Sequence, residues 1–371
     1  MRRLACVFAM AGLFVALASS TALAAGDSRA AGLERLQHAI QTAAKNAYPA
    51  FSEKAAFSAA MKGYLGSIDA YSTYISPEEV EVLRMSNNRE FVGIGMDIVQ
   101  DHQGFLYCLP YAGSPAEQAG IGYGDRLRSI DGVQAESLPL QSVMGRIRGQ
   151  EGTTVTLGIV GGEGLRERIL TRQRLTLPAV ELLRDDNLPR IRIMRFDEQT
   201  MGQLRAALAA IADGSPLILD LRGNVGGDLQ VAADIAGLFL PDGDLIVTLR
   251  KKNKPPVVLQ AKAEVKAGVG AIVLWQDKFT ASAAEVFCAA LSQNKRGKTL
   301  GQRSFGKGVT QQATSAGDGG LFIITNAELL PPDGQPYDRK GLEPDMLVVR
   351  RSASIHEDFL RRSHEAFGVK P

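Results

Sequence analysis

The sequence is poor in the side chains on which many hydrolytic, metal and redox sites depend. Its 371 residues include only four His, three Cys and one Trp, and aromatic residues make up 6% of the chain. None of the four His lies in a glycine-rich or nucleophile motif, so a Ser-His-Asp triad has weak support. The scattered His and Cys also give no metal-ligand spacing, and we expect neither a metal nor a cofactor.

The chain also lacks an excess of either charge. Lys and Arg number 42 against 40 Asp and Glu, which gives a formal net charge of +2. A chain so close to neutrality offers no general attraction to polyanions. The basic stretch at residues 250–254 is followed by Pro255 and Pro256 and is better explained as a solvated loop. We therefore expect no nucleic-acid partner.

Long hydrophobic runs are missing except at the amino terminus. Arg2 and Arg3 precede an apolar run over residues 4–17, and residues 22–24 are Ala-Leu-Ala. The run is shorter than the roughly 20 residues that a membrane span needs, so a cleavable signal peptide over residues 1–24 is favoured over an uncleaved anchor. The remaining chain is then exported to the periplasm or another extracytoplasmic compartment, and we expect no integral membrane span in it.

Cysteine usage gives little sign of a disulfide framework. Cys6 would leave with the signal peptide, so Cys108 and Cys288 remain. These two fall in segments that we assign to different domains, and free buried thiols are favoured over a disulfide between them.

Hydrophobic periodicity divides the chain into successive segments. Residues 25–88 form a helical segment, with a helical pattern between residues 33 and 65, and residues 89–172 contain short strands and a helix at 138–148. Strands and helices alternate over residues 173–350, which is typical of an α/β core. The strands are expected at 191–194, 217–221, 245–249, 257–259, 271–275, near 299 and at 321–327, and the helices at 201–211, 229–240 and 282–291. Residues 351–371 are highly charged and predict a peripheral helix.

A serine stands where the predicted strand 271–275 gives way to a helix. The helix is expected to begin at Ser282, so its hydroxyl would lie at the positive end of the helix dipole, where an alkoxide is stabilised. A simpler alternative is a capping box formed by Ser282 and Glu285, which requires no catalysis. The two interpretations are compatible.

A nucleophilic serine without histidine needs another base, and Lys307 is the best candidate. A lysine can serve if burial lowers its pKa. Lys307 lies between Gly306 and Gly308, and in an extended segment Gln311 projects to the same face and can hold the amine. The alternatives are a surface lysine and a phosphate-binding loop. Residues 301–307 fit G-x-x-x-x-G-K, but glycine occupies position 308, where that loop has Ser or Thr.

A glycine-rich turn follows the predicted strand 217–221. Residues 220–228 are D-L-R-G-N-V-G-G-D. Such a segment can be a strand-to-helix turn that simply needs glycine. Alternatively, its consecutive amides can form an oxyanion hole.

Along the chain, the glycine-rich turn, Ser282 and Lys307 follow one another after a unit that looks like a PDZ domain. With this arrangement the chain resembles the C-terminal processing, or tail-specific, serine peptidases of the S41 family. The resemblance runs from residue 50 to residue 349. It rests on D-x-Y-S-x-Y at 69–74, L-R-G-N-x-G-G at 221–227, T-A-S-A-x-E at 280–285, F-G-K-G at 305–308 and G-L-E-P-D at 341–345. It implies an α/β (α+β) fold: a ClpP/crotonase-like peptidase core at 173–350, an inserted PDZ domain at 89–172 and an N-terminal helical segment.

The resemblance also implies a Ser-Lys dyad. Ser282 attacks the scissile carbonyl, Lys307 takes its proton and returns it to the leaving amine, and Gln311 orients Lys307. The implied oxyanion donors are the amides of Ala283 and Gly226. Residue 227 is an alternative to Gly226, because Val stands at position 225 where the family commonly has Pro.

The PDZ domain would bind the free C-terminal carboxylate of a substrate on the backbone around Gly93, Ile94, Gly95 and Met96 and accept apolar tail side chains. Arg148 would couple this docking to the active site. The expected substrates are exported proteins or peptides with apolar free C-termini. Two alternatives stay open: a catalytically silent PDZ-bearing scaffold, and a related hydrolase of small acyl substrates. A homo-oligomer and an activating adaptor are open as well.

Overall fold

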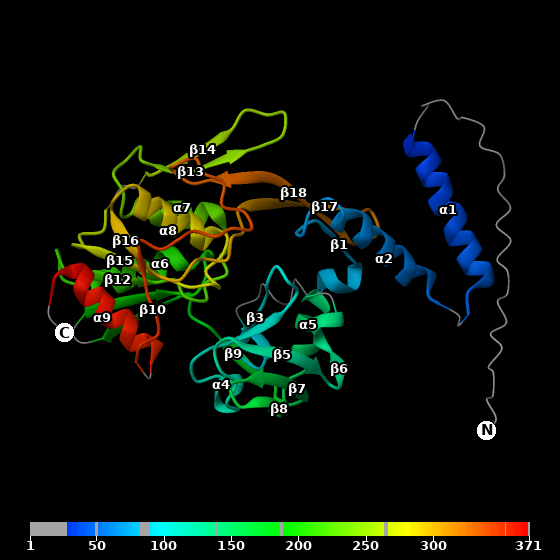
Figure 1. Cartoon of the computed structure of the whole chain (residues 1–371), viewed down its shortest axis with the longest axis horizontal. Coiled ribbons are helices and arrows are strands. Elements are labelled where there is room, and N and C mark those ends of the chain that lie inside the picture. Colours follow the sequence, from blue (N-terminus) through cyan, green and yellow to red (C-terminus); the bar gives the residue numbers. More distant parts are fainter. Residues whose placement is uncertain are drawn as a thin grey trace, which may run out of the picture. The chain divides into compact units, whose positions relative to one another are not determined.

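The computed structural model describes residues 28–48, 51–81, 90–138, 140–185, 188–262, 266–352 and 354–369 (Figure 1). The chain divides into two compact units, residues 1–59 and 60–371. The predicted signal peptide lies outside the described residues. Among those residues, no helix is both long enough and apolar enough to cross a bilayer.

Two helices form where the sequence predicted a helical segment. They are α1 (Ser28–Asn46) and α2 (Glu53–Gly66). The first strand of the structure, β1 (Thr73–Ile75), follows them.

Residues 90–176 form a β-rich unit around one hydrophobic core (Figure 1). One sheet contains β3 (Met96–Gln100), β4 (Leu106–Pro110), β5 (Asp125–Ile130), β6 (Val133–Gln134), β7 (Thr154–Gly161) and β8 (Gly164–Thr171); a second pairs β2 (Glu90–Gly93) with β9 (Gln173–Thr176). The helices are α4 (Pro115–Gln118), η1 (Ala135–Ser137) and α5 (Leu140–Ile147). β2 and β3 are separated at Ile94 and Gly95, because Gly95 has a φ of 75°.

The core of the second half is a sheet with the order β10-β11-β12-β15-β16-β19. Its strands are β10 (Val180–Asp185), β11 (Leu188–Ile193), β12 (Leu217–Asp220), β15 (Ile272–Gln276), β16 (Gly297–Gly301) and β19 (Met346–Leu347). β10 and β11 pair antiparallel, and all other neighbours pair parallel.

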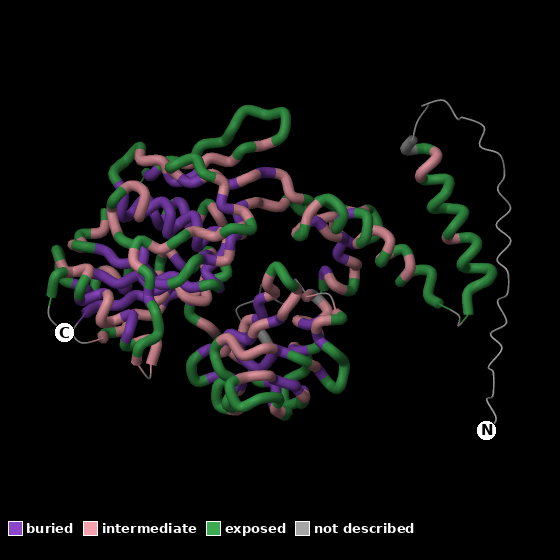
Figure 2. Tube along the Cα trace, in the orientation of Figure 1, coloured by how far each residue is buried: buried purple, intermediate pink, exposed green. Residues whose placement is uncertain are grey.

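Helices cover both faces of this sheet. Along β12, Leu217 and Leu219 belong to the hydrophobic cluster that includes α6 (Thr200–Ala209), α7 (Leu229–Gly237) and α8 (Ala283–Gln293). Ile218, on the opposite face, packs in the cluster that includes α9 (Ile355–Phe367). Figure 2 shows buried residues concentrated in these layers. This alternation is what a parallel strand enclosed on both sides requires.

The C-terminal segment is a helix, as predicted, but it is not peripheral. Phe359 of α9 is buried and its ring lies 5.0 Å from that of Trp275. Trp275 Nε1 donates a hydrogen bond to Ser363 Oγ at 2.8 Å. The charged composition of residues 351–371 concealed this apolar stripe, which completes the core.

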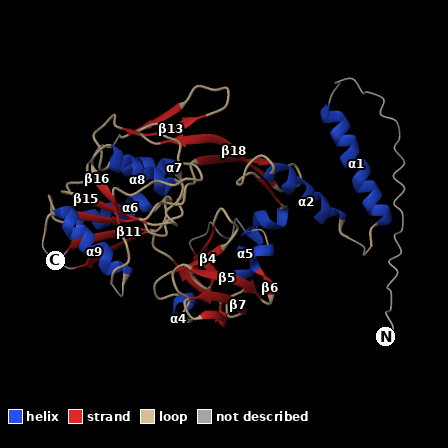
Figure 3. Cartoon of the chain, viewed as in Figure 1, coloured by secondary structure: helices blue, strands red, loops and turns tan. Residues whose placement is uncertain are grey.

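An antiparallel sheet joins distant parts of the chain (Figure 3). It has the order β1-β18-β13-β14, with β17 also paired to β18. Its further strands are β13 (Leu245–Arg250), β14 (Val257–Gln260), β17 (Val309–Ser315) and β18 (Leu321–Leu330). The pairing of β1 with β18 brings the segment around residues 69–75 next to the strands that follow Lys307.

Cys108 and Cys288 are both buried and both free. The prediction of two free thiols is confirmed.

Candidate active site

The topology brings three predicted segments to one edge of the core sheet. β12, β15 and β16 are adjacent and parallel, and they lead into residues 221–227, 277–282 and 302–308. The carboxyl ends of parallel strands meet at one edge, which is where open α/β sheets bind ligands. Hydrogen bonds join the segments directly: Ala281 N donates to the Asn224 carbonyl at 2.9 Å, and Phe305 N donates to the Thr280 carbonyl at 2.9 Å.

Ser282 occupies a strained turn between β15 and α8. Its φ of 57° and ψ of −122° lie in a region that residues with a side chain rarely adopt. A serine held in a sharp strand-to-helix turn is a feature of nucleophile elbows. The backbone N–H of Ser282 donates to Glu285 Oε2 at 2.8 Å, so the Glu285 half of the predicted capping box is present.

Gly226 packs directly against the start of α8. A Cβ atom at this position would lie 2.9 Å from Ser282 Cβ and 3.1 Å from Ala283 N, so a side chain does not fit. The Gly226 N–H donates to Asn224 Oδ1 at 2.8 Å and is engaged in this structure. By contrast, the Gly227 N–H donates no hydrogen bond to any described residue.

Glu285 links the turn at residues 277–282, which ends at Ser282, to the loop at residues 302–308, which carries Lys307. Its carboxylate is buried and accepts four hydrogen bonds. Oε1 accepts from the Ser304 hydroxyl at 2.5 Å and from Gly306 N at 2.7 Å. Oε2 accepts from Ser282 N and from Lys307 N, both at 2.8 Å. Burial raises the pKa of Glu285 to about 7, although these hydrogen bonds favour the ionised form.

Lys307 lies in a largely enclosed environment. Burial lowers the pKa of its amine, and the negative charges of Glu285 and Asp338 act in the opposite direction. Its Nζ lies 5.7 Å from the centroid of the Tyr71 ring. The Tyr71 hydroxyl and Gly308 N both donate to Asp338 Oδ1, at 3.3 Å and 3.0 Å. Tyr71 and Asp338 therefore support the loop on both sides of the lysine.

Gln311 does not stand in the regular extension that the sequence suggested. β17 begins only at Val309, and its register with β18 shifts between Thr310 and Gln311. A β-bulge breaks the two-residue alternation, so the shared face of Lys307 and Gln311 no longer follows from spacing. The Gln311 Nε2 is buried and has no hydrogen-bond partner among the described residues. Its role toward Lys307 stays a prediction.

The residues predicted to bind a C-terminal tail line one pocket of the β-rich unit. They are Gly93, Ile94, Gly95, Met96 and Arg148. The carbonyls of Ile94 and Gly95 accept hydrogen bonds at 2.9 Å from the backbone, whereas their N–H groups donate to no described residue. Two open amides beside an arginine suit a carboxylate.

Arg195, which lies in none of the predicted motifs, lines the same pocket and follows the end of β11. Its Nη2 lies 3.1 Å from Tyr111 Oη, and the Tyr111 hydroxyl donates to Asp97. The next residue, Phe196, donates from its backbone N to the Gly226 carbonyl at 3.1 Å. The pocket and the glycine turn are thus connected through two consecutive residues.

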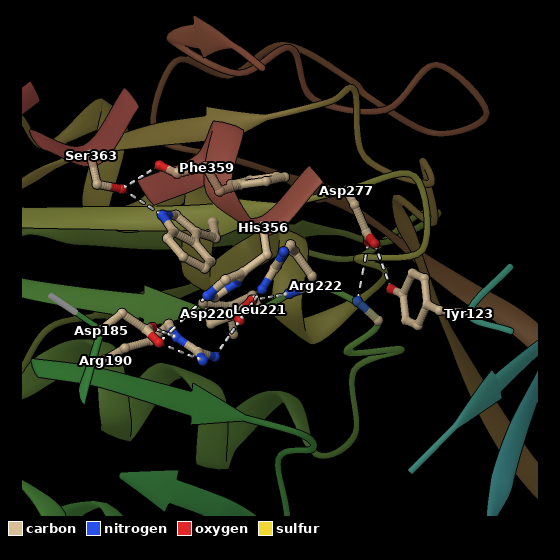
Figure 4. A network of polar contacts seen from close by, with 12 residues as sticks. Tyr123, Asp185, Arg190, Asp220, Leu221, Arg222, Asp277, His356, Phe359 and Ser363 are labelled. Carbon is tan, nitrogen blue, oxygen red and sulfur yellow. Dashed lines mark hydrogen bonds and ion pairs between the residues drawn. The ribbon is translucent and has the colours of Figure 1, made fainter. Parts of the chain in front are cut away.

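An ionic network anchors the base of the glycine turn (Figure 4). Arg222 Nε and Nη2 donate to the two carboxylate oxygens of Asp220, at 2.8 and 2.7 Å. The guanidinium lies 4.4 Å from the Trp275 ring centroid and 4.6 Å from that of Phe359. Burial alone would raise the pKa of Asp220, but the neighbouring arginines outweigh it and hold the pKa at about 2.

Asp277, Asp338 and the long-range partners of Glu285 were not predicted from the sequence. Tyr71 and Glu285 had a signal, because both lie in the motifs of the resemblance. Asp277 forms an Asx turn with Phe279 N at 3.0 Å, which Asp at the end of a strand can indicate.

Comparison with known proteins supports this assembly of parts. Residues 188–348 match peptidase family S41, and residues 107–161 match the PDZ domain. The carboxy-terminal processing protease CtpA of Bacillus subtilis is 31% identical over 327 residues, which cover 86% of this chain and 69% of that protein. The chain therefore belongs to peptidase family S41.

Further relatives agree. A CtpA-like serine protease of Staphylococcus haemolyticus is 31% identical over 321 residues, and the match spans 85% of this chain but only 65% of the relative's length. The solved photosystem II D1 C-terminal processing protease has a TM-score of 0.70 at 24% identity, covering 87% of this chain and 90% of that chain. The predicted fold class, a mixed peptidase core with a PDZ domain and N-terminal helices, is confirmed.

Proposed function

We propose that the chain is a serine endopeptidase that recognises the C-terminal tails of exported proteins through its PDZ domain and cleaves with a dyad of Ser282 and Lys307. One observation carries the dyad: a single oxygen of buried Glu285 accepts from the backbone N of both residues. This carboxylate joins the turn at residues 277–282, the proposed nucleophile turn, to the loop at residues 302–308 that carries Lys307.

In the proposed reaction the neutral amine of Lys307 takes the proton of Ser282 as Oγ attacks the scissile carbonyl. The lysine then gives that proton to the leaving amine, and Gln311 orients the lysine. A water molecule, deprotonated by the same amine, hydrolyses the acyl-enzyme. Burial lowers the pKa of Lys307, which favours the neutral form that the first step needs.

The tetrahedral intermediate requires amide donors beside Ser282. The Ala283 N–H at the first position of α8 is one proposed donor. The second comes from the glycine turn. The Gly226 N–H could donate to the oxyanion only after losing its hydrogen bond to Asn224 Oδ1. The Gly227 N–H donates to no described residue and could do so directly.

Tail recognition is assigned to the pocket around Gly93, Ile94, Gly95 and Met96. The open amides would hold the carboxylate, and Met144 and Ile147 of α5 offer apolar contact to the tail side chains. Arg148 would sense the docked tail. We further propose that the chain acts outside the cytoplasm after loss of residues 1–24.

The function can be tested with a purified protein substrate that ends in an apolar tail with a free carboxylate, and with the same tail amidated. The wild-type chain is expected to cleave the free-tailed substrate faster. Ser282→Ala and Lys307→Ala should abolish cleavage, while Lys340→Ala, on a neighbouring loop, should not. Wild-type-like cleavage by either dyad variant would refute the dyad, and absence of cleavage by the wild type would favour the silent scaffold.

A further inference from the structure

One PDZ side chain reaches the base of the two turns that carry the proposed nucleophile and oxyanion donors. Tyr123 lies in the turn before β5, and its hydroxyl donates to Asp277 Oδ2 at 2.5 Å (Figure 4). Asp277 follows β15 directly and begins the turn that ends at Ser282. This hydrogen bond therefore joins the PDZ domain to the nucleophile turn.

The other oxygen of Asp277 holds both turns. Oδ1 accepts from Gly223 N at 3.1 Å, from Phe279 N at 3.0 Å and from Thr280 N at 3.1 Å. Gly223 belongs to the glycine turn, and the other two residues belong to the nucleophile turn. A carboxylate fixed by Tyr123 at one oxygen presents the other oxygen in a defined direction to these three amides.

The Tyr123 hydroxyl is closely enclosed. A Cβ at Gly223 would lie 2.8 Å from Tyr123 Oη, and Gly223 has a φ of 73°, so only glycine suits this contact. The Tyr123 ring meets the ring of Phe279 edge-on, with centroids 5.6 Å apart. Tyr123 as a whole is 46% exposed, and burial together with the charge of Asp277 raises the pKa of its hydroxyl well above the ordinary value.

We propose that Tyr123 is a positioning residue for the peptidase reaction, whose hydroxyl orients Asp277 so that the nucleophile turn and the glycine turn keep their active arrangement. The proposal rests on the proposed function. Tyr123 does not line the tail pocket. It is therefore expected to affect the rate of the chemical step on every substrate and to leave tail affinity unchanged.

Tyr123→Phe removes only the hydroxyl, and Tyr107→Phe is its matched control. The Tyr107 ring also packs on Phe279, with centroids 5.4 Å apart, but its hydroxyl bonds to Asp101. We expect Tyr123→Phe to lower kcat about tenfold on both free-tailed and amidated substrates, the effect of losing one hydrogen bond to a charged group. KM for the free-tailed substrate should not change, and Tyr107→Phe should retain wild-type kcat.

Asp277→Asn provides a second variant. If the two residues act as one unit, the Tyr123→Phe/Asp277→Asn double variant loses little more activity than Asp277→Asn alone. Fully additive losses would separate Tyr123 from Asp277 and overturn the proposal.

Amide hydrogen exchange tests the same idea without relying on peptidase activity. Tyr123→Phe should accelerate exchange at Gly223, Phe279 and Thr280, and Tyr107→Phe should not. Unchanged exchange and kcat in Tyr123→Phe, an effect on KM alone, or a rise in kcat would each overturn the proposal. If the wild type cleaves neither substrate, the proposed function fails, while the exchange data still decide whether Tyr123 orders the two turns.

Discussion

The proposed catalytic edge (residues 221–227, 277–282 and 302–308) and the proposed tail pocket (lined by residues 93–96 and Arg148) are built in opposite ways. At the catalytic edge two buried carboxylates, Glu285 and Asp277, accept the amides of the turns around them. In the pocket, the amides of Ile94 and Gly95 donate to no described residue. The first arrangement fixes positions before any substrate is present, as catalysis requires. The second leaves donors open for a ligand to complete.

The sharpest way to separate the two regions is to remove the proposed nucleophile. Ser282→Ala should lower kcat on the order of 10⁴-fold or more, because Ser282 makes the new bond, yet leave the dissociation constant of an apolar free-tailed peptide unchanged. Cleavage and peptide binding by fluorescence anisotropy would measure the two effects. Ser292→Ala on the same helix is the control, and parallel loss of both properties would contradict the separation.

Glu285→Ala should disturb the relative positions of Ser282 and Lys307. Without the carboxylate, the buried amides of Gly306 and Lys307 lose their acceptor at a cost of about 1–3 kcal/mol each. Misplacement of the dyad should reduce kcat about 10²-fold.

Kinetics together with the free energy of unfolding from urea titration would measure both effects. Glu357→Ala, at an exposed position in the first turn of α9, is the comparison. Wild-type kcat in a destabilised Glu285→Ala variant would show that the carboxylate serves stability alone.

Arg195→Met should affect the pocket more than the edge. Loss of the guanidinium removes positive charge from the pocket and its contact with Tyr111, so KM for a free-tailed substrate should rise about tenfold, while an amidated substrate changes little. Steady-state kinetics on both substrates, with Arg184→Met as control, would measure this. An equal effect on both substrates would show that Arg195 supports the catalytic edge and does not recognise the substrate carboxylate.

Asp338→Asn should give the smallest effect, a change in pH dependence. Burial already lowers the pKa of Lys307, and the charge of Asp338 opposes that shift. Its removal should lower the pKa further, so the neutral amine becomes available at lower pH. The rising limb of the kcat/KM profile should then move to lower pH, with Asp333→Asn as control. A shift to higher pH would contradict the assignment of Lys307 as base.

The parts of the site that depend on local sequence could be predicted. The apolar strands that precede residues 221 and 277 are short runs ended by turn residues, and the Ser282-Glu285 spacing indicates a helix start. In the folded sheet, β12, β15 and β16 are neighbours, and their order brings the segments that follow them together. The long-range partners of Glu285 could not be predicted, because they depend on β15 and β16 being neighbours.

Other elements had no usable local pattern. The contacts of Tyr123 with Asp277 and of Arg195 with Tyr111 cross the boundary between the PDZ domain and the core. The spacing of residues along the chain does not predict such contacts. The β-bulge at Gln311 cannot be detected from a two-residue alternation. Most residues of α9 are charged or polar, so its composition predicted a peripheral helix. The few residues that pack it against the core, Phe359 and Ser363 among them, form too weak a pattern to be detected.

Covalent labelling of the wild type and of Lys307→Ala with a fluorophosphonate, in the presence of a free-tailed apolar peptide, tests the Ser282–Lys307 dyad most directly. Peptide mass spectrometry would locate and quantify the adduct. We expect an adduct on Ser282 in the wild type and its loss in Lys307→Ala. An adduct on another serine, or equal labelling of Ser282 in both proteins, would contradict it.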